Sequence, residues 1–119
     1  MADEQSRLMV QRKEEVTIVE FMDWNIIDEA AIQQIGEQIN QLVEQSAYPK
    51  LLISFENVDH LSSAALGTLI TVNNQIRRKD GQLRLANIDP QIQEVFVITK
   101  LNKLFQIHDS TDGALASFK

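Results

Sequence analysis

Apolar positions recur along the chain with two different periods, and each period predicts a different kind of element. Five short runs rich in apolar and β-branched residues predict strands. These runs are Leu8–Arg12, Val16–Phe21, Leu51–Phe55, Leu83–Leu85 with Ile88 as a further candidate, and Leu104–Ile107. The continuous apolar run Leu51–Ile53 is typical of a central strand that is covered on both faces.

Four other segments carry apolar residues at helical spacing. They run from Asp28 toward Pro49, from Ser62-Ser63 to Asp80, from Asp89-Pro90 through Thr99, and from Thr111 to Phe118. Asp28 and Asp89 are suited to the N-cap position, and Pro90 to the first helical position. Gly81 is expected to take the left-handed conformation that ends the second helix.

Inward-facing stripes are predicted on the second and third of these helices. Their members are Leu66, Leu69, Ile70, Asn73 and Ile76 on the second helix, and Ile92, Val95, Phe96 and Thr99 on the third. Gly67 stands alone inside the second helix, where the absence of a side chain predicts close packing of the helix on a strand.

The order of elements predicts an α/β protein, because strands that alternate with helices pair in parallel through right-handed crossovers. We expect a mainly parallel sheet of about five strands with an antiparallel edge strand and four helices. The length of 119 residues predicts a single domain over residues 1–119, with residues 1–6 as a flexible tail.

Composition excludes several functional classes. The chain has no cysteine, so it has no disulfide, thiolate metal site or cysteine nucleophile. The net charge of −6 argues against nucleic-acid binding, since the basic cluster Arg77-Arg78-Lys79 is explained by its place at a helix C-terminus. No apolar run approaches the roughly 20 residues of a membrane span. We therefore expect a cytoplasmic protein.

The sequence contains no recognisable catalytic or metal-binding pattern. His60 and His108 are the only histidines, and neither has carboxylates at the spacing of a ligand set. A packed or half-exposed ring is the expected state of His60. We predict no catalytic residue, no metal and no cofactor.

The pair Ser62-Ser63 lies where a strand gives way to a helix. The first N–H groups of a helix lack partners within it, and its dipole favours negative charge at this end. A serine hydroxyl at this position is well placed to be phosphorylated reversibly, and it is equally well placed to form an ordinary helix cap. Both interpretations remain open from the residues alone.

The chain resembles the STAS domain, and in particular the bacterial anti-sigma factor antagonists. In the family pattern, apolar residues lead into Asp-Ser-Ser-Gly, which is followed by Leu-Gly. Here Ser62-Ser63-Ala64-Ala65 precedes Leu66-Gly67. Further similarity lies in Ile27-Asp28, in the strand from Gly81 to Asn87, and in the segment from Val95 to Phe105. The resemblance covers nearly the whole chain.

The resemblance implies a protein that binds a kinase-like anti-sigma factor and so frees a sigma factor. In the family the kinase phosphorylates the second Ser of the pattern, and a phosphatase reverses the reaction. Here that position is Ala64, which has no hydroxyl, and the family's Asp is replaced by Ser62. Ser63 and Ser62 are therefore the candidate phosphoacceptors. The shift from Ala64 to Ser63 moves the hydroxyl by about 100° around a helix and by ~1.5 Å.

The candidate partner-binding residues surround this pair. They are His60, Leu61, Ser62, Ser63, Ala64, Ala65 and Asp28. The alternative function is that of a constitutive, non-phosphorylated STAS subunit of a larger assembly, or of a module that binds a lipid or nucleotide in the groove beside the second helix.

Overall fold

The computed structural model describes residues 8–21, 25–26, 29–56, 58 and 60–118, with the side chains of residues 25, 26 and 29 left out. Within these residues a five-stranded sheet has the strand order β1-β2-β4-β6-β7. The strands are β1 (Leu8–Lys13), β2 (Val16–Phe21), β4 (Lys50–Ser54), β6 (Gln82–Ala86) and β7 (Gln106–His108). β1 is antiparallel to β2, and the other neighbours are parallel.

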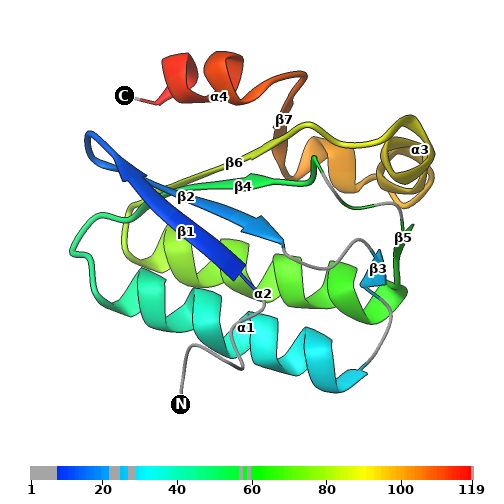
Figure 1. Ribbon diagram of the computed structural model, residues 1–119, viewed down its shortest axis with the longest axis horizontal. Helices are drawn as coiled ribbons and strands as arrows, with labels where there is room; N and C mark the ends of the chain where they lie inside the picture. Colours follow the sequence, from blue (N-terminus) through cyan, green and yellow to red (C-terminus); the bar gives the residue numbers. More distant parts are fainter. Residues whose placement is uncertain (1–7, 22–24, 27–28, 57, 59, 119) are drawn as a thin grey trace.

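Helices cover both faces of this sheet (Figure 1). α1 (Glu29–Glu44) and α2 (Ser63–Arg78) lie side by side on one face, and α4 (Thr111–Ser117) lies on the other. α3 (Pro90–Ile98) lies beyond one end of the sheet. The predicted α/β class, with four helices and an antiparallel edge strand, is confirmed.

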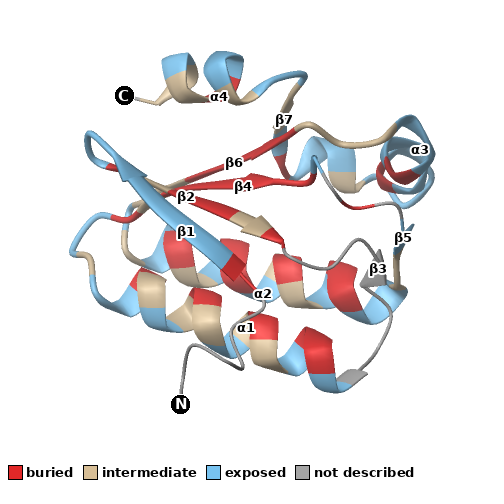
Figure 2. Ribbon diagram, in the orientation of Figure 1, coloured by how far each residue is buried: buried red, intermediate tan, exposed pale blue. Residues whose placement is uncertain are grey.

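Two apolar cores follow from the alternation of side chains along each strand. Leu51 and Ile53 of β4 face α1 and α2, whereas Leu52 faces α4 together with Val16 and Ile18 of β2. Leu52 and Ile53 are fully buried, and Figure 2 shows buried residues along the central strands and on the inward faces of both long helices. The prediction of a central strand covered on both faces is confirmed.

The sequence missed two very short strands. β3 (Asn25–Ile26) and β5 (His60–Leu61) pair in parallel as a separate two-stranded sheet. Neither has the length of alternating pattern that predicts a strand. Two strand limits also differ: β6 ends at Ala86, before Ile88, and β7 begins at Gln106, because residues 101–103 form a short 3₁₀ turn.

The predicted stripe on α3 is only half correct. Ile92 and Phe96 are buried, whereas Val95 and Thr99 are exposed. The reason is that α3 has nine residues and lies at the end of the sheet, where one narrow side of the helix contacts the core. Val97 and Ile98 are exposed as well, at 53% and 74%.

The end of α2 corrects the prediction for Gly81. Asp80 is the left-handed residue, with φ 57°, and the N–H of Gly81 donates to Ile76 O at 2.9 Å. This is the Schellman arrangement with Asp80 at its left-handed position. Gly81 is needed for another reason, since a Cβ there would collide with the carbonyl oxygen of Pro49 and lie 2.9 Å from Ile76 Cγ2.

The prediction that Gly67 permits close packing is wrong. Gly67 is exposed, and a Cβ at this position would meet nothing within 4 Å. The glycine lies on the solvent side of α2, where its backbone freedom lowers helix stability.

These two glycines give opposite predictions for substitution by alanine. Gly81→Ala should lower the free energy of unfolding by about 1–3 kcal/mol, because the added methyl group overpacks the contact with Pro49. Gly67→Ala should raise it by about 0.5–1 kcal/mol. Urea denaturation of both variants measures the difference, and a stable Gly81→Ala variant would contradict the described contact.

Candidate functional site

The chain that leads from β4 to α2 is anchored by two buried apolar residues. Phe55 and Val58 are 0% and 1% exposed. The N–H of Phe55 donates to Ala86 O at 2.9 Å, and its ring lies 5.2 Å from the ring of Phe21. β5 follows and leads directly into α2, at the end of the molecule where α3 also lies (Figure 1). The start of α2 therefore has a fixed position relative to the sheet.

Ser62 is the N-cap of α2. Its backbone is extended, and its Oγ accepts a hydrogen bond from the N–H of Ala65 at 3.2 Å. The N–H of Leu66 donates to Ser62 O at 3.1 Å and begins the helical pattern. The interpretation of Ser62 as a helix cap is confirmed.

Ser63, the other candidate phosphoacceptor, is the first residue of α2 and is exposed. No hydrogen bond to its hydroxyl is formed within the described part of the chain. The first turn of α2 contains no acidic residue, so no side chain of that turn compensates the positive end of the helix dipole. A negatively charged group at Ser63 would meet a favourable electrostatic environment.

The other predicted contact residues separate into surface and core. His60 and Ala64 are exposed and Leu61 is half-buried, so of the two states expected for His60, packed or half-exposed, the packed one is wrong. Ala65 is only 5% exposed and belongs to the core, which removes it from the contact surface. Asp28 lies outside the described residues. We call His60, Leu61, Ser62, Ser63 and Ala64 the junction surface.

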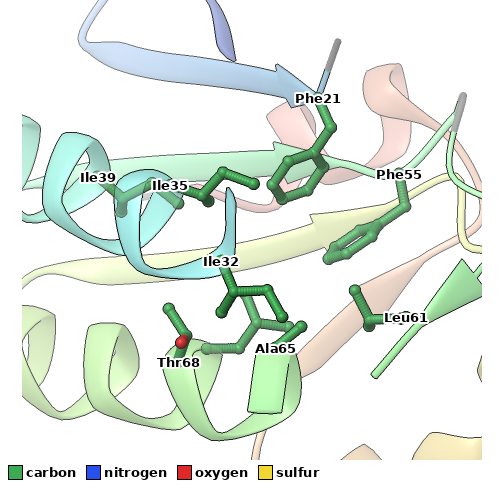
Figure 3. A pocket seen from close by; sticks show the side chains of 9 residues that line it. Phe21, Ile32, Ile35, Ile39, Phe55, Leu61, Ala65 and Thr68 are labelled. Carbon is green, nitrogen blue, oxygen red and sulfur yellow. The ribbon is translucent and has the colours of Figure 1, made fainter. Parts of the chain in front are cut away.

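A narrow apolar cavity lies behind the junction surface (Figure 3). It is lined by Phe21 at the end of β2, Phe55 just after β4, Ile32 of α1, Leu61 of β5 and Ala65 of α2. Its volume is about 10 Å³, which is enough for about one water molecule. The two aromatic rings thus lie behind Leu61 of the junction surface.

Metal binding and membrane insertion find no support in the residues that the structure describes. Their His, Asp and Glu side chains do not form a group of three that could hold a metal ion. Over the same residues, no helix has the length and apolar character of a membrane span.

The class of the protein follows from its fold, which has a mixed sheet with an antiparallel edge pair, helices on both faces and a capped helix start. The STAS domain model matches residues 7–114, and the chain belongs to the STAS domain family. This confirms the resemblance seen in the sequence. The prediction of a non-catalytic protein agrees with the antagonist-type members of this family.

Two curated relatives match most of the chain. BtrV of Bordetella bronchiseptica is 27% identical over 94 residues, which are 79% of this chain and 80% of that protein. The anti-sigma-B factor antagonist of Bacillus subtilis is 26% identical over 89 residues, which are 75% of this chain and 80% of the relative. The chain is thus similar to anti-sigma factor antagonists.

A solved structure confirms the fold independently. An anti-sigma-factor antagonist (STAS) domain protein from Planctomyces limnophilus superposes with a TM-score of 0.85 at 20% identity. The match covers 92% of this chain and 96% of that protein. The arrangement of sheet and helices is therefore that of a STAS domain.

The two serines should differ in their effect on stability. Ser62→Ala removes the cap and should lower the free energy of unfolding by about 1 kcal/mol. Ser63→Ala removes an exposed hydroxyl and should change it by less than about 0.5 kcal/mol. Urea denaturation of the two variants tests the assignment, and equal effects would show that the cap is not formed by Ser62.

Proposed function

We propose that this protein is an anti-sigma factor antagonist that binds a kinase-like anti-sigma factor through the junction surface. The single observation that carries the proposal is the exposed, uncharged start of α2, with Ser63 and Ala64 on the surface and no acidic residue in the first turn. The similarity to curated antagonists supports the same function.

The physical properties of the junction surface fit a partner that approaches closely. Ala64 presents only a methyl group, and Leu61 adds a half-buried apolar side chain beside it. The cap at Ser62 holds the backbone of this turn in one conformation, so little entropy is lost when the partner binds. An oxygen or carboxylate of the partner would be favoured near the helix N-terminus.

Phosphorylation of Ser63 is the regulatory step that this function suggests. The Oγ of Ser62 is engaged in the cap, whereas the hydroxyl of Ser63 is exposed at the first helical position. A phosphate would add about −1.5 to −2 charges there and would be tolerated by the helix N-terminus. The same charge would have to be desolvated on partner binding, so affinity would fall far more than stability. A phosphatase would restore binding.

The second candidate function is constitutive binding without a covalent switch. Ala64 favours it, because it occupies the position that carries the phosphorylated serine in the family pattern. The apolar cavity behind the junction surface, at about 10 Å³, is too small for a lipid chain. A cytoplasmic location follows from the proposed partner, since sigma factors act on RNA polymerase. The net charge of −6 supports a protein partner rather than nucleic acid.

Ala64→Glu should abolish partner capture while the fold is retained. The new carboxylate lies in the first turn of α2, where the dipole stabilises it, but it places a charge inside the proposed interface. Asn74→Glu is the matched control, because Asn74 is exposed on the same helix about three turns away.

The measurement is affinity capture from native cells, with identification of the anti-sigma factor by mass spectrometry and circular dichroism as the test of fold. Wild type and Asn74→Glu should recover the anti-sigma factor, and Ala64→Glu should not. Equal recovery by all three would place the interface elsewhere on the protein.

The phosphoswitch is tested by peptide mass spectrometry of protein from its native cells, with phosphatase-treated protein as the control. We expect one phosphoryl group on Ser63 and none on Ser62. Ser63→Asp should weaken capture of the anti-sigma factor more than Ser63→Ala does. Absence of the phosphopeptide across growth and stress conditions, with equal capture by both variants, would establish the constitutive alternative.

A further inference from the structure

An open depression, which we call the edge notch, lies at the β7 edge of the sheet. It is bounded by the last two turns of α2, the start of β6, the segment before β7 and the end of α4. Its volume is about 500 Å³, which is within the range of small-molecule binding sites. It is distinct from the junction surface, with which it shares no residue.

The register of the sheet creates this depression. β7 pairs with β6 from Arg84 to Ala86, with Gln106 opposite Arg84. β6 itself begins at Gln82, so its first two residues extend beyond the start of β7. Arg84 lines the depression, and its Nη1 donates to Leu83 O at 3.1 Å.

Arg84 is a buried cation whose hydrogen bonds all go to neutral acceptors. It is 7% exposed, and its Nε donates to Ser117 Oγ at 2.9 Å. Nη2 donates to Gln82 Oε1 at 3.0 Å and to Ser117 O at 3.4 Å. The ring of Phe118 lies 5.1 Å from the guanidinium carbon. Of the five N–H donors of arginine, one on Nη1 is left without an acceptor within the described residues.

No carboxylate compensates this charge in the part of the chain that the structure describes. Burial without a counterion is unfavourable for a charged group, and desolvation lowers the pKa of Arg84. A bound anion would supply the missing countercharge and accept the remaining N–H.

Two side chains of α2 line the same depression. Asn73 is 6% exposed, and its Nδ2 is buried, so this group does not reach a ligand in the open depression. Arg77 follows one helical turn later, is exposed, and forms no ion pair with a described residue. The described lining contains no Asp or Glu, although the whole chain carries a net charge of −6. A local excess of positive donors in an acidic protein indicates an anion site.

We propose that the edge notch binds the phosphate group of a small organic phosphate monoester, through Arg84 and Arg77. Guanidinium groups match the oxygens of a phosphate and form charge-assisted hydrogen bonds with it. The depression is larger than a bare phosphate, and Leu104, which is 38% exposed, gives an apolar wall for the organic part. This site is independent of the proposed binding of an anti-sigma factor.

The test is an NMR titration of the full chain at constant ionic strength with ribose 5-phosphate, inorganic phosphate and ribose. Ribose 5-phosphate should produce saturable shifts of backbone amides at Gly81, Leu83 and Gln106. Inorganic phosphate should bind at the same amides more weakly, and ribose should produce no saturable shift.

A matched pair of arginine variants separates a built site from general charge attraction. Arg77→Gln should weaken binding of ribose 5-phosphate at least about tenfold, because a charge-assisted hydrogen bond is lost. Arg78→Gln removes the same charge from the neighbouring exposed residue, which does not line the edge notch, and should weaken binding less than about twofold.

Three results would overturn the proposed site, and a fourth would overturn the proposed ligand. The first is the absence of saturable shifts at millimolar ribose 5-phosphate, and the second is an equal loss of binding in the two arginine variants. The third is a set of shifts centred on Ser63 and Ala64, which would assign the anion to the N-terminus of α2. Equal affinity for inorganic phosphate and ribose 5-phosphate would overturn the assignment to a monoester.

Discussion

Burial of β4 on both faces is the constraint on which the rest of the structure depends. Leu51, Leu52 and Ile53 are each at most 2% exposed, and their side chains alternate between the core under α1 and α2 and the core under α4. A parallel central strand of this kind requires helices on both sides of the sheet. The crossover from β4 to β6 then places the start of α2 near the carboxyl end of β4. The junction surface is a direct consequence of this topology.

The junction surface combines a rigid backbone with chemically simple side chains. Ser62 uses its hydroxyl to satisfy the N–H of Ala65, and Ala65 itself faces the core. Ser63 and Ala64 remain on the surface at the positive end of a helix of 16 residues. The serine that caps the helix and the exposed serine are therefore different residues. A phosphate on Ser63, as proposed above, would leave the cap at Ser62 in place.

The sequence predicted the architecture well, because β2 and β4 are runs rich in apolar and β-branched residues and the helical period is long and regular in α1 and α2. It failed where an element is short or lies at the end of the sheet. β5 has two residues, and α3 presents only Ile92 and Phe96 to the core. The left-handed turn after α2 fell on Asp80 because Gly81 is held against Pro49, a long-range contact that no local pattern encodes.

The sequence located the candidate site but could not say how its side chains divide between core and surface. Ala64 and Ala65 are identical in type, and only the packing of α2 against the sheet makes one exposed and the other buried. Of the edge notch the sequence showed only Arg77, in a basic cluster that was explained by its place at a helix C-terminus. Arg84 lies between two apolar residues of a predicted strand, and Asn73 lies in an apolar stripe. Their shared depression depends on the register of β6 and β7.

The two surfaces lie at opposite ends of α2, and this separation has a functional consequence. A helix of 16 residues is about 24 Å long, so a phosphate on Ser63 and an anion beside Arg77 would interact only weakly through solvent. Any coupling between them would have to pass through the packing of α2 against the sheet. Leu69, Val72 and Ile76 fill this contact and are each at most 3% exposed, and so tightly packed a helix resists small shifts. The two sites are thus expected to act independently, and each can be altered without disturbing the other.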